Sequence, residues 1–496
     1  MNILLIAPKH GFHPSTQYVP LGLLSIATYL KKRGYCVRLY DRNTEQIPLN
    51  QALKDFRPHV TGISAIATRQ LPDATAIAGE LKKQGFPVVW GGPMASIIPE
   101  MLLREDVADY IVIGEGEVTF LQLLQAIEQK RSAAQVKGIA FLGEQGEVCR
   151  TAEREFTDLA ELPASDWAFV TPEKYFSPFV GCTKMTSVYV SKGCPGRCSF
   201  CINEFYHRCR YRARPIEHVI DELKQLVAHG MDGVFFADEW FGMDKRYLYQ
   251  LCDQLRPLNI AWGSQTRLGH FTREDLQYMY DCGCRWLYFG VESGVPQVLE
   301  RMNKHLDLTK IDGELENCKE IGIATISGFI IGLPDETEDE LRESLRLMRR
   351  LDAMYDTQIL IHTFSPIPGS ELYRDLAGQG RLIPHQSLQQ WGSYAKSIDL
   401  SVNYSNVPAL ELNVIQYYFR WRRAFRKETP NSTIGTPFSK TIAMAIIVLR
   451  NALQQGFLHI FRSLSFYAAL FCKAAWYRFA YPGILKKYGL NGKYSP

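Results

Sequence analysis

The sequence predicts an α/β protein in three parts: a doubly wound sheet domain, a partial barrel of six βα units, and a helical appendage at the C-terminal end. Short apolar runs alternate with amphipathic segments along most of the chain, which is typical of parallel sheets covered by helices. The 496-residue chain is also too long for one hydrophobic core. Its 46% hydrophobic content is ordinary for a globular protein.

Five strand-like runs define the first domain and six define the barrel. In the first domain the strands are expected at 2–7, 37–40, 61–64, 88–91 and 110–113, and the helices at 21–33, 69–84 and 117–130. In the barrel the strands are expected at 187–191, 233–237, 260–264, 286–291, 325–331 and 358–364, and the main helices at 216–229, 274–281 and 336–351. Ligands bind where parallel strands end at their carboxyl side, so site residues are expected there.

We place the segment boundaries where composition and pattern change. They give a Rossmann-like domain at 1–140, an ordered linker at 141–185, the barrel at 186–375 and a helical, basic and aromatic appendage at 376–496. The linker is rich in aromatic residues, which argues against a flexible tether. We therefore expect the two domains to pack against each other.

Three cysteines, Cys194, Cys198 and Cys201, lie on one loop at spacings of four and three residues. Neighbouring glycine and proline let this loop fold tightly, so that the thiols can converge. An iron–sulfur cube is normally held by four thiolates. Three thiolates on one loop therefore leave one iron open to a ligand that the protein does not supply.

Other cysteine chemistries remain open at this point. A structural zinc site needs a second pair of ligands, and Cys209, Cys282 and Cys284 are poorly spaced for one but not excluded. A bland cluster of reduced cysteines is a further alternative. A disulfide framework is disfavoured, because 12 cysteines in 496 residues are sparse.

The cysteine loop resembles the CxxxCxΦC signature of the radical S-adenosylmethionine (SAM) superfamily, with Phe200 at the aromatic position. Four later stretches resemble strand ends of the same superfamily, in the same order. They are 234–239, 286–294, 328–337 and 363–370. A partial (β/α)6 barrel is the fold that this resemblance implies.

The resemblance also implies the ligands of the barrel. Cys194, Cys198 and Cys201 would bind a [4Fe–4S] cluster, whose open iron binds SAM. The implied SAM contacts are Phe200, Asp238, Glu239, Gln265, Arg267, Glu292, Ser293, Gly328, Gly332 and Glu336. Each acid taken singly is better explained as a solvated loop residue or helix cap, but their shared position at strand ends favours a site.

The loops of the first domain resemble those of the cobalamin-binding domain that precedes many radical SAM barrels. Glycines at strand ends allow a bulky ligand to approach the backbone closely. The implied cobalamin contacts are Leu21, Gly22, Ser64, Thr68, Gly91, Gly92, Pro93, Gly114, Glu115 and Glu117.

One departure concerns the lower ligand of cobalt. Methionine-synthase-like domains carry Asp-x-His-x-x-Gly after the first strand, whereas residues 8–14 lack this motif and offer only His10 and His13. Several radical SAM enzymes with a B12-binding domain, the subgroup that this chain resembles, also lack this motif. A relic domain that keeps the fold and binds nothing stays open as an alternative.

The subgroup as a whole is that of radical SAM enzymes with a B12-binding domain. It comprises cobalamin-dependent methyltransferases and enzymes like the anaerobic magnesium-protoporphyrin ester cyclase. The resemblance implies an enzyme that cleaves SAM to a 5′-deoxyadenosyl radical and methylates an unactivated carbon, with a flavodoxin- or ferredoxin-type electron donor. The substrate would be a small molecule, hydrophobic or lipid. The alternatives are an oxidative cyclase or rearrangement enzyme, and a non-catalytic metal-binding scaffold at a membrane.

The end of the chain is strongly basic, with 13 Lys and Arg and one acid between Arg420 and Pro496. Its apolar runs at 441–449 and 464–472 are shorter than the ~18 residues needed to span a bilayer. Residues 430–496 are therefore expected either to lie on the inner face of a membrane or to cap the barrel. Nucleic acid is not expected as a partner.

The expected compartment is the cytoplasm. The apolar N-terminus lacks a basic segment and is interrupted by Pro8, so we interpret it as a first strand rather than a signal peptide. The thiols of the cysteine loop must also stay reduced.

Overall fold

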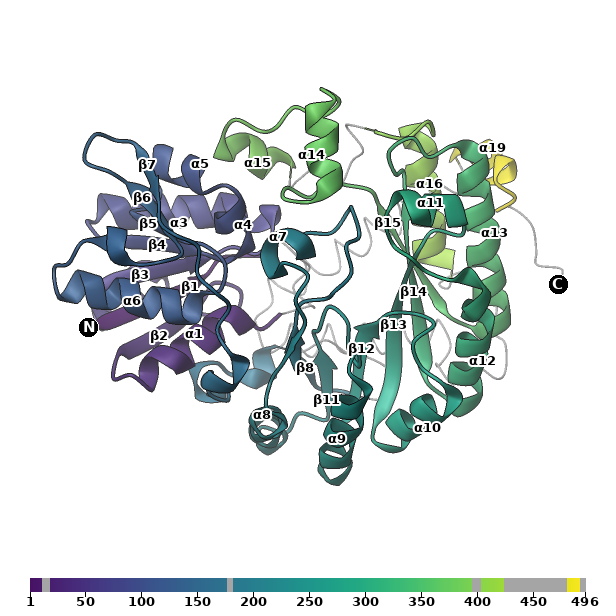
Figure 1. Cartoon of the computed structure of the whole chain (residues 1–496), viewed down its shortest axis with the longest axis horizontal. Coiled ribbons are helices and arrows are strands. Elements are labelled where there is room, and N and C mark those ends of the chain that lie inside the picture. The colour runs from purple at the N-terminus through teal and green to yellow at the C-terminus, as the bar shows by residue number, and fades with distance from the viewer. Residues whose placement is uncertain (11–17, 176–181, 395–402, 423–479, 491–496) are drawn as a thin grey trace.

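The computed structural model describes residues 1–10, 18–175, 182–394, 403–422 and 480–490. Figure 1 shows two sheet-containing units side by side, with the N-terminal unit in purple and blue and the barrel in teal and green. The segment that follows the barrel returns across the first unit through α14 (Glu371–Gly378) and α15 (Leu388–Tyr394). The predicted α/β class is confirmed.

The first unit is a seven-stranded sheet of order β2-β1-β3-β4-β5-β6-β7. Its five predicted strands are present and pair in parallel. They are β1 (Asn2–Ala7), β2 (Cys36–Asp41), β3 (Val60–Ser64), β4 (Val88–Gly91) and β5 (Tyr110–Val112). The sheet continues through two antiparallel strands, β6 (Ile139–Leu142) and β7 (Val148–Arg150), so it passes the boundary predicted at residue 140.

Helices lie between these strands. They are α1 (Leu21–Lys31), α2 (Leu49–Phe56), α3 (Leu71–Lys83), α4 (Gly92–Ile97), α5 (Pro99–Arg104) and α6 (Gly116–Glu128). Helix α1 shows why they form: Leu23, Leu24, Ala27 and Leu30 recur at helical spacing and are all buried. The doubly wound topology leaves the carboxyl ends of β1, β3, β4 and β5 free to line a site.

The barrel is a six-stranded parallel sheet in which sequence neighbours are also spatial neighbours. Its strands are β8 (Met185–Val188), β11 (Gly233–Phe236), β12 (Ala261–Thr266), β13 (Cys284–Glu292), β14 (Ala324–Ile331) and β15 (Gln358–Thr363). Its helices are α8 (Ile216–Ala228), α9 (Lys245–Leu255), α10 (Arg273–Asp281), α11 (Pro296–Arg301), α12 (Ile311–Ile321) and α13 (Glu338–Tyr355). Strands β8 and β15 do not pair with each other, so the barrel is open as predicted.

The first predicted barrel strand, 187–191, divides into two. Strand β8 ends at Val188, and β9 (Ser191–Lys192) pairs antiparallel with β10 (Arg212–Ala213). The cysteine loop and α7 (Asn203–His207) lie between β9 and β10. This two-stranded ribbon therefore closes the base of the cysteine loop.

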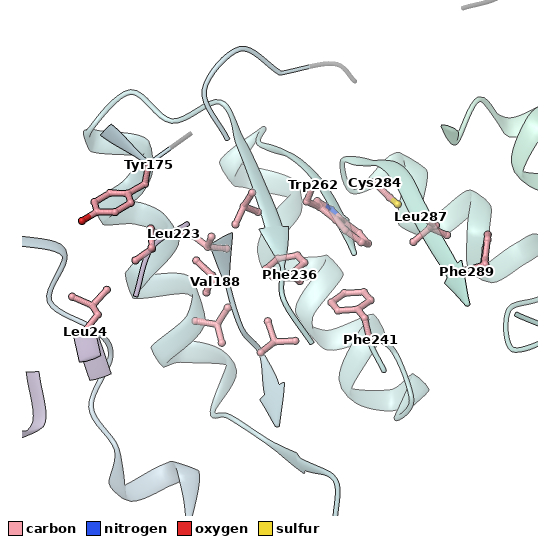
Figure 2. Packing of buried hydrophobic residues seen from close by; sticks show 14 of the residues in the cluster. Leu24, Tyr175, Val188, Leu223, Phe236, Phe241, Trp262, Cys284, Leu287 and Phe289 are labelled. Atoms are coloured by element: carbon pink, nitrogen blue, oxygen red, sulfur yellow. The ribbon is translucent and has the colours of Figure 1, made fainter. Parts of the chain in front are cut away.

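One hydrophobic core joins the two units. Figure 2 shows Val188, Phe236 and Trp262 of the barrel strands packed together, with Tyr175 of the linker nearby and Leu24 of α1 at the other side of α8. The linker backbone also bonds both units: Asp166 N donates to Thr28 Oγ1 at 2.9 Å, and Ser165 N donates to Glu222 Oε1 at 2.6 Å. The two units therefore pack directly against each other.

The described part of the appendage is attached to both units. In α15, Leu388 and Trp391 are buried in the core of the first unit. Helix α16 (Ala409–Arg422) lies on β15, where Gln416 Nε2 donates to Ile361 O at 3.3 Å. The short helix α19 (Pro482–Lys487) is joined to the barrel by Lys487, whose Nζ lies 2.6 Å from Glu338 and 3.0 Å from Glu411.

The two apolar runs at 441–449 and 464–472 lie outside the described residues. Within the residues that are described, no helix is both long and apolar enough to cross a membrane.

Candidate functional site

A cavity of about 710 Å³ lies between the first sheet and the mouth of the barrel. Its first wall consists of loops at the carboxyl ends of β1, β3, β4 and β5, and its second wall consists of barrel residues from Ser187 to Glu239. Cys201 of the cysteine loop also lines it. One cavity therefore adjoins both predicted cofactor sites.

Nearly all the predicted cobalamin contacts line this cavity. They are Leu21, Gly22, Ser64, Gly91, Gly92, Pro93, Gly114, Glu115 and Glu117. Thr68 is not among the lining residues; it begins a short 3-10 turn, Thr68–Gln70, beside the wall.

Glycine is needed at the tightest point of this wall. Gly92 has φ +87°, and a Cβ there would lie 2.8 Å from Ser64 Oγ and 2.9 Å from Ala65 O. The loops after β3 and β4 can therefore meet only without a side chain at this position. The absence of a side chain at Gly92 leaves the backbone accessible to a large ligand at this point of the wall.

The loop after β1 places His10 in the same wall, where it is 8% exposed. Its backbone N–H donates to Asn43 Oδ1 at 3.1 Å, which fixes the start of the loop. His13 lies outside the described residues. The cavity is thus large, has glycine loops along one wall and is bordered by an imidazole, and these features fit a corrin.

Glu115 and Glu117 line the cavity, but their carboxylates already have protein partners. Glu115 forms a two-pronged ion pair with Arg212, at 2.7 and 3.0 Å. Burial acts to raise the pKa of Glu115, but Lys192 and Arg212 hold it below its usual value. Glu117 accepts from Ser25 Oγ at 2.8 Å and lies 3.4 Å from Lys192 Nζ. Both acids therefore connect the two walls rather than standing free for a ligand.

The backbone of the cysteine loop is held by Asn203. Its Nδ2 donates to Cys194 O at 2.6 Å and to Gly196 O at 3.0 Å, and its Oδ1 accepts from Cys194 N at 3.0 Å. Gly193 has φ +82°, and a Cβ there would lie 2.1 Å from Arg210 O. The loop therefore requires glycine at 193 and an amide side chain at 203.

The three thiols of the cysteine loop lie near one another. Cys194, Cys198 and Cys201 are free and partly buried, and they lie close enough to influence one another electrostatically. Among the residues that the structure describes, no three Cys, His, Asp or Glu side chains converge on one ion position. In an iron–sulfur cube each thiolate binds a different iron, so the three sulfurs need not meet at one point.

Two cations compensate the charge that thiolates would bring. Burial raises the pKa of Cys201 to about 11 and also raises that of Cys198, while Lys304 and Arg267 act to lower the pKa of Cys198. Lys304 Nζ lies 2.9 Å from Glu292 Oε1. The guanidinium of Arg267 donates to the carbonyls of Lys304 and His305. Glu292 and Arg267, both predicted SAM contacts, thus position Lys304 beside the thiols.

The adjacent acids Asp238 and Glu239 lie in different surroundings. Glu239 lines the cavity, accepts from Gly193 N at 2.9 Å and lies 3.2 Å from His207. Burial acts to raise its pKa, but His207 and the Gly193 N–H bring it below the usual value. Asp238 is fully buried, accepts from Val190 N at 2.8 Å and from Ser191 Oγ, and does not line the cavity. Burial raises the pKa of Asp238 to about 7.

Two of the other predicted SAM contacts also have internal partners. Ser293 is buried against Ser344 of α13, with Oγ atoms 3.1 Å apart. Glu336 is buried and accepts from Gly332 N at 2.6 Å, and burial raises its pKa to about 7. Thr337, not Glu336, caps helix α13. Ser293 and Glu336 therefore stabilise the ends of β13 and β14 through buried hydrogen bonds.

The remaining predicted contacts lie along the barrel strands and beside them. A Cβ at Gly328 would lie 2.1 Å from the hydroxyl of Tyr288, so this glycine makes room for that ring. Gly332 has φ +75°, which permits the turn after β14. Gln265 is half-buried on β12, and Phe200 packs against the cluster of Val295 and its neighbours.

Several residues at the site were missed from the sequence. Lys192, Tyr206 and His207 line the cavity, Asn203 holds the cysteine loop, and Lys304 approaches the thiols. Lys192, Asn203, Tyr206 and His207 lie next to the cysteine loop in the sequence, and this position could have indicated that they belong to the site. Lys304 is separated from the loop by more than 100 residues and only the fold brings it close.

Among the residues that the structure describes, the cysteines outside the loop form no second group of metal ligands. Cys282 and Cys284 are buried in the hydrophobic core, and burial raises the pKa of Cys284 well above its usual value. Cys209 lies near the cysteine loop, with its Sγ 3.5 Å from Gly196 O.

Family models match the two units that form the two walls of the cavity. Residues 13–124 match the B12 binding domain, and residues 188–348 match the radical SAM superfamily.

Curated relatives extend this similarity over most of the chain. An uncharacterized methyltransferase of Pyrococcus horikoshii is 30% identical over 387 residues, which cover 75% of this chain and 82% of that protein. The anaerobic magnesium-protoporphyrin IX monomethyl ester cyclase of Rubrivivax gelatinosus is 29% identical, with 76% and 70% covered.

A solved structure agrees with the fold. The radical S-adenosylmethionine methyltransferase TsrM of Kitasatospora setae, solved with cobalamin and a [4Fe–4S] cluster, matches with a TM-score of 0.64. The match is 20% identical and covers 76% of this chain and 75% of that one.

Proposed function

Because the chain belongs to the radical SAM enzymes that carry a B12-binding domain, we propose that it methylates an unactivated carbon of a hydrophobic small molecule. Its cofactors are a [4Fe–4S] cluster, SAM and cobalamin. A relative that is a methyltransferase supports methylation. The hydrophobic character of the substrate is supported by Phe235, a barrel residue that lines the cavity.

One observation carries the proposal: a single cavity is lined by the glycine loops of the first sheet and by Cys201 of the cysteine loop. Methyl transfer to a substrate radical requires both cofactors to reach one carbon atom. Separate pockets would not allow this. The shared cavity does, and the two units that form its walls share one hydrophobic core.

The residues of the chain have distinct roles in this reaction. Cys194, Cys198 and Cys201 would hold the cluster, and Lys304 balances its charge. Glu239 presents a carboxylate to the cavity for the amino group of SAM. When bound, the cofactors supply a carbon-centred radical and a methyl group, and the enclosed walls keep water away from that chemistry.

The test is an anaerobic incubation with SAM, reductant and cobalamin, followed by quantification of two products. A methyltransferase releases 5′-deoxyadenosine together with S-adenosylhomocysteine. Release of 5′-deoxyadenosine without S-adenosylhomocysteine would favour the cyclase alternative, which the relative from Rubrivivax gelatinosus supports. Release of neither would leave only the non-catalytic scaffold.

We also propose an external electron donor of the flavodoxin or ferredoxin type. Arg197 of the cysteine loop lies 3.2 Å from Glu204 but has a side chain that is 65% exposed, and an exposed cation there suits an acidic donor. A cytoplasmic location agrees with the free cysteines of the described residues. Peripheral membrane contact through 430–496 stays a proposal, although Lys487 is already paired with Glu338 and Glu411.

A further inference from the structure

We propose that Lys192, Arg212, Glu115 and Glu117 form an interdomain ion-pair network that holds the cobalamin-binding loops at a fixed distance from the cluster loop. The inference rests on the proposed function, because it requires both cofactors to be bound. It assigns a positioning role to residues that do not themselves react.

The two cations of the network flank the cysteine loop. Lys192 lies on β9, two residues before Cys194, and Arg212 lies on β10 after the loop. The two residues are direct partners in the antiparallel ribbon. Any movement of the ribbon therefore moves both cations and the base of the cysteine loop together.

The two acids come from one turn of the first unit. Glu115 is the residue before helix α6, and Glu117 lies in its first turn. A carboxylate is favoured there because the helix dipole is positive at this end. Ser25 of α1 donates to Glu117 at 2.8 Å, which holds that side chain in place before any contact with the barrel.

The contacts between these groups are close and shielded from water. Lys192 Nζ lies 3.6 Å from Glu115 and 3.4 Å from Glu117, and Arg212 Nη2 lies 2.7 Å from Glu115. The Glu115 and Glu117 side chains are 8% and 4% exposed. Buried pairs are screened little by salt, and loss of one partner leaves an uncompensated charge.

A third contact on the same loop excludes a chance pairing. The hydroxyl of Tyr206, on α7, donates to Gly114 O at 3.2 Å. The 114–117 loop is thus bound by Lys192 before the cysteine loop and by Tyr206 and Arg212 after it. Gly114, Glu115, Glu117, Lys192 and Tyr206 all line the shared cavity, so the network lies in the wall that joins the two cofactor sites.

The test uses Lys192→Met, which removes the ammonium group and keeps most of the stem. The matched control is Lys31→Met, since Lys31 also joins the first unit to the rest of the chain, through Asp166 at 2.6 Å, but has a side chain that is 56% exposed. Both full-length variants are loaded with cluster and cobalamin. Two quantities are measured: the Kd for cobalamin, and the spin–spin interaction between cob(II)alamin and the reduced cluster in electron paramagnetic resonance (EPR).

Lys192→Met should raise the Kd at least tenfold and change the spin–spin interaction, while Lys31→Met changes the Kd less than twofold and leaves the interaction intact. Glu117→Gln should reproduce the effect of Lys192→Met, and the double variant should be no weaker than either single one. An unchanged interaction in Lys192→Met and Glu117→Gln would overturn the inference. Glu117→Gln alone provides the comparison if Lys192→Met does not fold.

Failure of the proposed function gives a different result. A wild-type protein that binds no cobalamin would refute the proposed function itself. A wild-type protein that binds cobalamin, with variants that match it, would refute only the network.

Discussion

At the level of residues, spacing predicts which groups lie together when they share one loop. Cys194, Cys198 and Cys201 lie close enough to influence one another electrostatically, and their role as cluster ligands stays a prediction. Asp238 is the opposite case: it follows a predicted strand as expected, but its carboxylate turns inward to Val190 and Ser191. The sequence predicted where this strand ends, but it did not predict the direction in which the side chain of Asp238 points.

The cysteine assignment predicts a sharp difference between two thiols. Cys198→Ala should lose the broad visible absorbance of the cluster and all SAM cleavage, because two thiolates do not retain a cube. Cys209→Ala is the control, since Cys209 lies near the loop but outside the trio. A Cys198→Ala protein with full iron content would contradict the assignment, as would loss of the cluster in Cys209→Ala alone.

The buried carboxyl of Glu336 predicts a pH dependence of stability. Burial raises the pKa of Glu336 to about 7 in the folded protein. The protonated carboxyl therefore contributes to the free energy of unfolding in full below about pH 4, and this contribution is lost as the pH rises through 7. Glu336→Gln stays uncharged and should be more stable than wild type at pH 8, by on the order of 3 kcal/mol at 1.36 kcal/mol per pKa unit.

The measurement is the thermal unfolding midpoint of both proteins between pH 5 and pH 8. The difference between them should grow with pH. Equal pH dependence in wild type and Glu336→Gln would show that this carboxyl does not ionise as its burial requires.

At the level of elements, the prediction succeeds for the parallel strands and fails for the antiparallel ones. All five parallel strands of the first sheet and all six of the barrel appear within a few residues of their predicted places. Strands β6, β7 and β10 were missed, and Ser191 of β9 was assigned to the first barrel strand, because these antiparallel strands do not follow the alternation of strands and helices that predicts the others. The β9–β10 ribbon sets the base of the cysteine loop, so the site itself was predicted less completely than the fold.

The turn between β4 and α4 gives a prediction at this scale. Gly92→Ala puts a methyl group 2.8 Å from Ser64 Oγ at a left-handed φ, and it should weaken cobalamin binding at least tenfold by reshaping the wall. Gly79→Ala in α3 is the control, because nothing lies within 4 Å of its Cβ. Titration of each apoprotein with hydroxocobalamin measures the effect, and equal affinities would mean that the wall is not the corrin surface.

At the level of the whole molecule, the packing of the two units decides the function. The aromatic linker predicts that the units touch, and the shared core from Leu24 to Phe236 shows that they do. The sequence does not indicate which faces meet. Glu115 and Glu117 illustrate this: their glycine-flanked motif suggests a ligand site, but only the docked barrel reveals that Lys192 and Arg212 are their partners.

The central claim is that one molecule holds a SAM-binding iron–sulfur cluster and cobalamin at a common cavity. Anaerobic purification with hydroxocobalamin, followed by Mössbauer spectroscopy and visible spectroscopy of the same sample, tests it most directly. The account predicts one [4Fe–4S] cluster and one cobalamin per chain, with one iron site altered when SAM is added. Zinc in place of iron, or a cluster unaffected by SAM in a protein without cobalamin, would contradict it.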